Sequence, residues 1–261
     1  MSEPLLSVRK LNIRHIASGQ TLVKEVSFSV AQDGRMTMLG QSGSGKTMSC
    51  RAILGLLNQR SFELSGTIEF DGISLLSIPQ RRRKDVYGSG IVFVPQNPMT
   101  ALDPSRKVGH QVRQFLNLHQ RLSTAETEEK YVAALRETGL TQTQRILNSF
   151  PHQLSGGMLQ RVLIALALAQ NARLIIADEP TTALDAISKD QSVELLCQMQ
   201  RRGCAILLVT HDFHVAKQLG GDVIVLKDGA TVETGGIEQI LSAPKAAYTK
   251  ELIAASVLDW R

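Results

Sequence analysis

The sequence has few cysteines, few aromatic residues and no long apolar run, and each shortage excludes a class of protein. Its three cysteines form no CxxC pair and no cluster with histidine, and their odd number argues against a disulfide framework, so we expect buried thiols. Seven Phe, three Tyr and one Trp offer little surface on which nucleic-acid bases could stack. The longest apolar run, residues 162–169, is too short for a membrane-spanning helix.

The charge balance is mildly basic. The chain of 261 residues carries 29 basic and 24 acidic side chains, and the basic ones are scattered except for a run at 81–84. Such a run is as typical of a solvated face, or of a surface near anionic phosphates or lipid, as of a nucleic-acid groove. We predict no nucleic-acid partner. The first residues carry no basic leader, so we expect no signal or transit peptide and a cytosolic location.

Short apolar segments alternate with helical patterns, which predicts an α/β fold with a mixed or parallel sheet and helices. Segments with alternating polarity predict an N-terminal antiparallel β layer at 6–8, 26–30 and 66–70, with a turn at 71–72. A further strand is predicted at 91–94. Nearly continuous apolar segments predict parallel strands covered on both faces at 36–39, 174–177, 205–209 and 223–226.

Between residue 108 and about 150 the patterns indicate helices and no strand. Ser123 and Glu126 form a capping-box pattern, and Gly139 is a typical C-terminal stop. We therefore predict one domain, 1–261, with its nucleotide-binding core at 1–96 and 160–261 and an inserted α-helical subdomain at 97–159.

One segment matches the phosphate-binding pattern G-x-x-x-x-G-K-[ST] in full, after a predicted strand and before a helix predicted at 47–57. Glycines let successive N–H groups point into one concavity, and the helix N-terminus adds partial positive charge. The lysine can reach the β- and γ-phosphates of a nucleotide, and the threonine can offer its hydroxyl to Mg²⁺. The residues are Gly40, Gln41, Ser42, Gly43, Ser44, Gly45, Lys46 and Thr47.

Two adjacent carboxylates, Asp178 and Glu179, stand at the exit of the apolar strand predicted at 174–177. Neighbouring acids in a partly buried site need a cation or hydrogen bonds to remain ionised. Asp178 fits support of Mg²⁺ together with Thr47, and Glu179 fits the polarisation of an attacking water. Together with the phosphate loop, these acids predict a nucleoside triphosphatase.

A second anion-binding pattern, Ser155-Gly156-Gly157, precedes an apolar helix predicted at 159–170. One nucleotide needs only one phosphate loop. The second pattern therefore suggests a nucleotide held by another subunit.

The series of motifs resembles the ATP-binding cassette (ABC) family along nearly the whole chain. Leu154–Met158 is similar to the signature motif, residues 40–47 to Walker A, and 178–179 to Walker B with the catalytic glutamate. The resemblance implies a dimer that holds two ATP molecules, each between Walker A of one chain and the signature motif of the other. It also implies catalytic roles for Glu179, His211 and Gln96. Mg²⁺ would be bound by Thr47, Gln96 and Asp178. The nucleotide would be contacted by Ser155, Gly156 and Gly157 and by Asp185, the last residue of the D-loop at 182–185.

Two positions depart from the family pattern. Met158 stands where the commonest signature motif has glutamine, although the three preceding residues are intact. The aromatic residue that stacks on adenine is missing, and His15 occupies its place.

Segments 94–104, 108–111 and 151–161, with a C-terminal stretch containing Pro244, Tyr248, Thr249 and Leu252, resemble the nickel, dipeptide and oligopeptide importer group. This implies a peripheral ATPase subunit on the cytoplasmic face of the cell membrane. Its implied partners are a second ATPase, commonly a different one, two integral-membrane permeases and an extracellular or periplasmic solute-binding protein. The Gly-Gly-Met signature and the end of the chain at residue 261, without a cysteine-bearing tail, favour nickel or a metal complex as solute. The alternatives are a dipeptide or oligopeptide importer, a cassette ATPase in a soluble complex, and a cytosolic cassette that acts on DNA or ribosomes.

Overall fold

The structure, a computed structural model, describes residues 3–119, 123–182 and 185–258. The chain forms two compact units, one from residues 1–79 and 205–261 and the other from 80–204. Within the described ranges, no helix combines the length and the apolar character needed to cross a membrane. The predicted subdomain boundaries after residues 96 and 159 stay a prediction.

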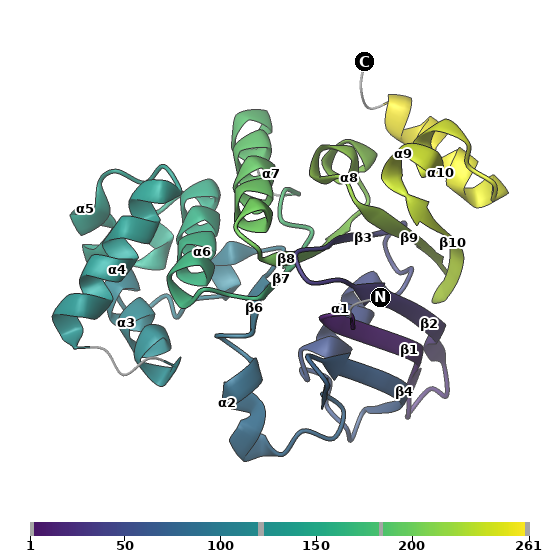
Figure 1. Cartoon of the computed structure of the whole chain (residues 1–261), viewed down its shortest axis with the longest axis horizontal. Coiled ribbons are helices and arrows are strands. Elements are labelled where there is room, and N and C mark those ends of the chain that lie inside the picture. Colours follow the sequence, from purple (N-terminus) through teal and green to yellow (C-terminus); the bar gives the residue numbers. More distant parts are fainter. Residues whose placement is uncertain (1–2, 120–122, 183–184, 259–261) are drawn as a thin grey trace. The chain divides into compact units, whose positions relative to one another are not determined.

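The first unit begins with an antiparallel layer, as predicted. Strand β1 (Leu6–His15) lies between β2 (Thr21–Val30) and β4 (Phe62–Phe70) (Figure 1). Strand β5 (Ile73–Ser74) pairs with β4. The β4–β5 turn falls at Asp71-Gly72, where both residues have positive φ, as a two-residue hairpin turn requires. Alternate side chains of β1, including those of Leu11 and Ile13, are fully buried.

The parallel strands of this unit are also confirmed. Strand β3 (Arg35–Leu39) lies between β8 (Ala205–Thr210) and β9 (Asp222–Lys227), parallel to both. Strand β10 (Ala230–Gly236), which the sequence analysis missed, joins β9 to β2, so the order within the unit is β5-β4-β1-β2-β10-β9-β3-β8. Its helices are α1 (Lys46–Ile53), α8 (Phe213–Leu219), α9 (Ile237–Ser242) and α10 (Ala247–Leu258).

The helix predicted at 47–57 is shorter than expected. Helix α1 ends at Ile53 because Gly55 adopts a left-handed conformation (φ 64°) and donates its N–H to the carbonyl of Ala52 (3.1 Å). Leu56, beyond this stop, is 62% exposed.

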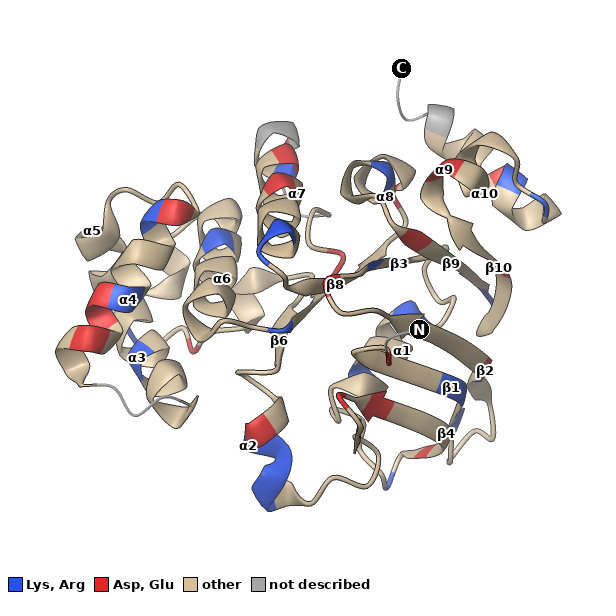
Figure 2. Cartoon of the chain, in the orientation of Figure 1, with Lys and Arg blue, Asp and Glu red and all other residues tan. Residues whose placement is uncertain are grey.

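The second unit contains one parallel strand pair and most of the helices. Strand β6 (Ile91–Val94) pairs with β7 (Leu174–Asp178). The helical elements are η1 (Gln80–Arg82), α2 (Arg83–Val86), η2 (Pro98–Thr100), α3 (Val108–His119), α4 (Thr124–Glu137), α5 (Thr143–Asn148), η3 (Pro151–Gln153), α6 (Gly156–Gln170) and α7 (Ala186–Arg201). The run of basic residues lies on η1 and α2 (Figure 2).

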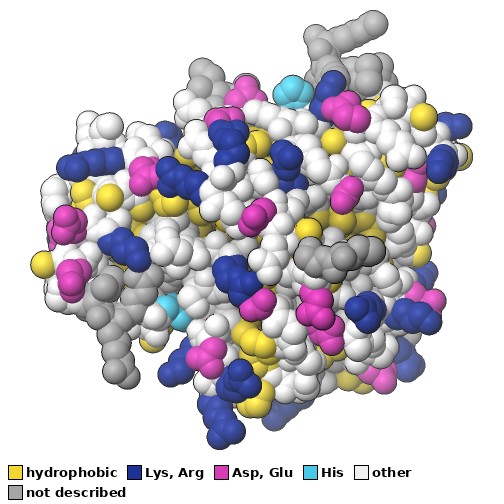
Figure 3. All heavy atoms as spheres, viewed as in Figure 1, with side chains coloured by type: hydrophobic (Ala, Val, Ile, Leu, Met, Phe, Trp, Pro, Cys, Tyr) yellow, Lys and Arg dark blue, Asp and Glu magenta, His cyan; other side chains and the backbone are white. Residues whose placement is uncertain are grey.

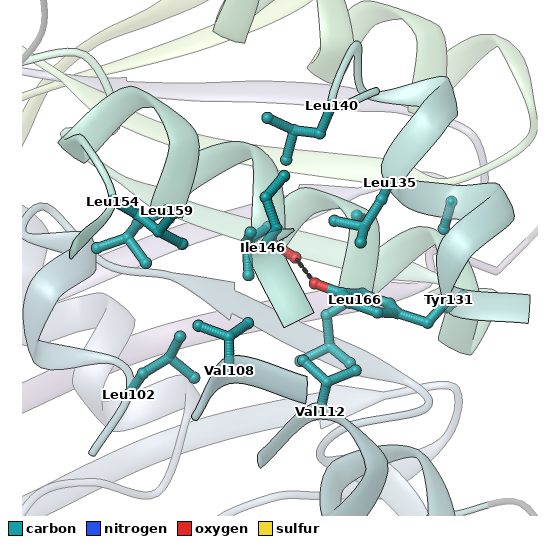
Figure 4. Packing of buried hydrophobic residues seen from close by; sticks show 14 of the residues in the cluster. Leu102, Val108, Val112, Tyr131, Leu135, Leu140, Ile146, Leu154, Leu159 and Leu166 are labelled. Atoms are coloured by element: carbon teal, nitrogen blue, oxygen red, sulfur yellow. Dashed lines mark hydrogen bonds between the residues drawn. The ribbon is translucent and has the colours of Figure 1, made fainter. Parts of the chain in front are cut away.

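Helices α3 to α6 pack around one apolar cluster (Figure 4). At its centre Tyr131 is 1% exposed and donates its hydroxyl to the carbonyl of Val162 (3.0 Å), and burial raises the pKa of this hydroxyl. The predicted capping box is confirmed, because Ser123 accepts the N–H of Glu126 and Glu126 accepts that of Ser123. Gly139 follows α4 with φ 77°, as its role as a stop requires.

Figure 3 shows charged side chains, and some hydrophobic ones, on one face of the molecule. Acidic and basic side chains are interspersed over the visible face (Figure 3). All three cysteines are buried, which confirms the expectation of buried thiols. Cysteine therefore contributes to packing in this fold.

Candidate nucleotide site

The phosphate loop joins β3 to α1 in the first unit, the context that the motif requires. Gly43 (φ 83°) and Gly45 (φ 99°) both lie in the left-handed region, which lets the backbone curl around a concavity. Helix α1 begins at Lys46, and Gly45 caps it without a side-chain hydrogen bond. The N–H groups at this helix start, together with the helix dipole, suit an anionic ligand.

Lys46 is buried within the phosphate loop. Its Nζ donates to the carbonyls of Gly40 (2.5 Å) and Gln41 (3.0 Å) and lies 3.5 Å from Oγ of Ser44. Only 6% of the residue is exposed. A buried ammonium group held by loop carbonyls is well placed to meet the charge of bound phosphates.

Gly40 is the tightest position in the loop, which leads to a first prediction. A Cβ at this residue (φ 153°) would lie 2.3 Å from the carbonyl oxygen of Leu226 and 2.6 Å from Oγ of Ser44. We expect Gly40→Ala to displace the loop and to weaken ATP binding by at least about tenfold. This corresponds to a loss of roughly 1.4 kcal/mol in the free energy of binding. Equilibrium titration with labelled ATP measures this.

Gly236→Ala is the matched control, because Gly236 has an ordinary φ (−67°) and no atom within 4 Å of its added Cβ. This variant should bind ATP as the unmodified chain does. Equal ATP affinity for the two alanine variants would contradict the packing argument.

His211 leaves the sheet beside the phosphate loop. Leu39, the last residue of β3, is the register partner of Thr210, the last residue of β8. Because neighbouring parallel strands end at the same edge, Gly40 and His211 emerge side by side. Asp212 then caps α8 by accepting the N–H of His214 (2.8 Å), and His211 itself is exposed.

His15 lies at the end of β1 and has an aromatic neighbour that the sequence analysis missed. Its ring centroid lies 5.3 Å from that of Phe62, its register partner on β4, and its Nδ1 lies 2.8 Å from Oγ of Ser18. Only strand pairing reveals this contact, since 47 positions separate the two residues in the sequence. The imidazole ring is thus held between a hydroxyl and a phenyl ring.

In the second unit, Asp178 and Glu179 stand at the exit of β7. They are 5% and 9% exposed. Glu179 has φ 47°, a left-handed conformation that costs a non-glycine residue about 1–3 kcal/mol and is concentrated at functional sites. Its Oε2 accepts the hydroxyl of Thr182 (3.0 Å), so the carboxylate is oriented as well as buried.

Gln96 leaves the same edge of the β6–β7 pair as the two carboxylates, because Val94 and Ala177 are register partners. Gln96 is exposed. The loop after it is fixed by buried Gln111, whose side chain accepts the N–H of Asp103 (2.8 Å) and donates to the carbonyls of Asp103 and Arg106 (2.9 Å each). The structure thus brings Gln96, Asp178 and Glu179 to one edge.

The second anion-binding pattern is a helix start, as predicted. Ser155 caps α6 by accepting the N–H of Met158 (3.3 Å), and the helix begins at Gly156, three residues before the predicted start. Met158 packs against the apolar cluster of this unit. An apolar residue therefore fits the position where the commonest signature motif has glutamine.

Asp185 caps α7, accepting the N–H of Ser188 (2.9 Å) and its hydroxyl (2.8 Å). Residues 183 and 184 of the predicted D-loop lie outside the described residues. Among the residues that are described, no group of three or more His, Cys, Asp or Glu is placed to hold a metal ion. The donor set predicted for Mg²⁺, a hydroxyl, one carboxylate and an amide, stays a prediction.

Comparisons of the sequence and the structure with known proteins all indicate the same protein family. A sequence model described as "ABC transporter" matches residues 23–182, more than half of the chain. The chain is similar to an ABC transporter subunit of Clostridium perfringens (26% identity, 98% of this chain and 96% of that chain, TM-score 0.78). It is also similar to an ATP-binding cassette solved as a dimer with ADP and phosphate (28% identity, 89% and 98% covered, TM-score 0.77).

Three curated relatives extend the similarity over nearly the whole chain. The metal-staphylopine import system ATP-binding protein of Staphylococcus aureus is 39% identical, with 96% of this chain and 92% of that protein covered. The dipeptide transport ATP-binding protein of Escherichia coli is 36% identical, with 96% and 78% covered. The peptidoglycan transport ATP-binding protein of Agrobacterium fabrum is 39% identical over 97% of this chain, which spans only 47% of that relative. The chain belongs to the ABC transporter family, as an ATP-binding and ATP-hydrolysing cassette with an α/β P-loop fold.

Proposed function

We propose that this cassette is the energy-supplying subunit of a membrane importer. The observation that carries the proposal is its similarity, over about 96% of its length, to ATP-binding proteins named for import or transport of metal-staphylopine and dipeptides. Its implied partners are a second ATPase subunit, two integral-membrane permeases and a solute-binding protein. The cassette then lies peripherally at the cytoplasmic face of the membrane.

Within the cassette, we assign the phosphate groups of ATP to the loop at 40–47. Its curled backbone, the buried Lys46 ammonium and the α1 N-terminus support this role. Thr47, Asp178 and Gln96 would hold Mg²⁺, and their hydroxyl, carboxylate and amide oxygens suit a hard cation. The cation, when bound, offsets charge on the phosphates.

Glu179 acts as the base that accepts a proton from the attacking water. Its burial and its hydrogen bond from Thr182 keep the carboxylate in one orientation, which favours proton transfer over a fixed distance. His211, next to the start of the phosphate loop, contacts the γ-phosphate. His15, supported by Phe62, contacts the base of the nucleotide.

A complete ATP site also needs a second subunit in this proposal. The α6 start at Ser155, Gly156 and Gly157 would bind the γ-phosphate of the nucleotide held by the partner, because its capped N–H groups and dipole suit an anion. Asp185 would face the same interface. The partner is a second cassette ATPase, which we take to be a different chain.

For the solute we propose a nickel or other metal complex, with a dipeptide or oligopeptide as the alternative. A metal-staphylopine system and a dipeptide system both stand among the relatives, at 39% and 36% identity. The Gly-Gly-Met signature at 156–158 is the sequence feature that favours a metal complex. The solute itself does not contact this chain.

Uptake in a strain that lacks the gene tests the proposal. We expect uptake of chelated radioactive nickel to fall to background and to return with the unmodified gene but not with Lys46→Ala. Labelled dipeptide uptake should be unchanged. Loss of dipeptide uptake alone would support the alternative solute, and normal uptake of both would contradict the importer function.

A further inference from the structure

The C-terminal helix α10 is anchored beside the phosphate loop, in the same unit. Both carboxylate oxygens of Glu233, on β10, accept backbone N–H groups at the approach to α10, from Lys245 (2.8 Å) and Ala246 (3.0 Å). Desolvation raises the pKa of Glu233, but hydrogen bonds to the carboxylate from Lys245, Thr249 and Ala246, with the charge of Lys245, outweigh it and leave the pKa below its ordinary value. The carboxylate therefore remains ionised and holds the helix start near neutral pH.

Tyr248, in the first turn of α10, has its ring and its hydroxyl in two different environments. The ring packs against the apolar cluster that contains Leu39, the residue before the phosphate loop. Nζ of Lys227, the last residue of β9, lies 4.7 Å from the ring centroid, a cation–π distance. Apolar packing and the cation–π contact thus explain the position of the Tyr248 ring, but they involve no contact of its hydroxyl group.

The hydroxyl of Tyr248 contacts the phosphate loop itself. Its oxygen accepts the backbone N–H of Gln41 at 3.3 Å. The backbone carbonyl of Gln41 accepts a hydrogen bond from Nζ of Lys46 at 3.0 Å. A continuous chain of contacts therefore runs from α10 through Gln41 to the lysine that we assign to the phosphates.

We propose that Tyr248 is a positioning residue for ATP binding. Its hydroxyl holds the beginning of the phosphate loop in place by accepting the N–H of Gln41. This N–H is directed to Tyr248, so the anchor does not compete with the N–H groups of residues 45–47 at the start of α1, which suit the phosphates. The Gln41 carbonyl is held in turn, and it keeps the Lys46 ammonium at the concavity. The inference deepens the proposed role of the loop and rests on it.

Tyr248→Phe tests the hydroxyl while keeping the ring, its packing and the cation–π contact. We expect the Kd for MgATP, and KM with it, to rise about two- to tenfold, the effect of losing one neutral hydrogen bond. We expect kcat and the midpoint of thermal unfolding without nucleotide to remain unchanged. Hydrogen exchange should quicken at the Gln41 amide and remain unchanged within α1. A purely structural role would move the thermal midpoint instead.

Two further variants make the result decisive. Tyr87→Phe removes another half-buried tyrosine hydroxyl, in the second unit, and should leave the Kd unchanged. Lys46→Ala reports on the loop itself. If Lys46→Ala abolishes ATP binding while Tyr248→Phe changes neither Kd nor Gln41 exchange, the positioning role is overturned and the loop assignment stands. If Lys46→Ala also binds ATP normally, the loop assignment itself fails.

Discussion

Glu179→Gln should lower kcat for ATP hydrolysis by about 10²- to 10⁴-fold, the range that a positioned general base contributes. Glutamine keeps the size of the side chain and can still accept the Thr182 hydroxyl, but it cannot take a proton from water. ATP should bind normally, so that the pair of cassettes proposed above accumulates in a closed, ATP-loaded form. Phosphate release and retained nucleotide, measured on the same sample, report the two effects separately.

Glu194→Gln is the matched control for this substitution. Glu194 is an exposed carboxylate on α7 that pairs with Arg201 (2.6 Å), and such surface pairs contribute little to stability. Its loss should leave turnover unchanged. Normal turnover by Glu179→Gln would refute the role of general base.

Lys46→Ala should weaken MgATP binding by about 100- to 1000-fold. Two unit charges about 4 Å apart interact by about 4 kcal/mol at an effective dielectric constant near 20, and each 1.4 kcal/mol is a tenfold change. The substitution also removes the donor that joins the carbonyls of Gly40 and Gln41, which adds to the loss by loosening the loop. Isothermal titration with MgATP measures the affinity.

Lys24→Ala provides the control for loss of charge, because Lys24 is an exposed lysine on β2 in the same unit. Its ATP affinity should match that of the unmodified chain. A thermal unfolding scan of both variants without nucleotide separates loss of binding from loss of fold. Similar affinities for the two alanine variants would contradict the assignment of Lys46 to the phosphates.

Local features of the fold were predictable because their causes lie within a few residues. The capping box of Ser123 and Glu126 and the stop at Gly139 depend on backbone conformation over one turn, and both are present. The phosphate loop between β3 and α1 follows from glycine spacing and from the apolar strand before it. The carboxylate pair at the end of β7 was found for the same reason.

Features set by distant contacts were not predictable. Strand β10 reads Ala-Thr-Val-Glu-Thr-Gly-Gly, without an apolar alternation, and forms because β9 offers it a pairing edge. The contacts of Phe62 with His15 and of Tyr248 with Gln41 join segments far apart in the sequence. The left-handed backbone of Glu179 leaves no sequence signal, since strain is visible only in the folded chain.

Bound ATP and released phosphate at this chain's own ATP site, measured together in the assembled complex for the unmodified chain, Lys46→Ala and Glu179→Gln, test the central claim most directly. The unmodified protein should bind ATP and release phosphate, Lys46→Ala should do neither, and Glu179→Gln should retain ATP without releasing phosphate. Phosphate release from Glu179→Gln at the unmodified rate, or normal ATP binding by Lys46→Ala, would contradict the account.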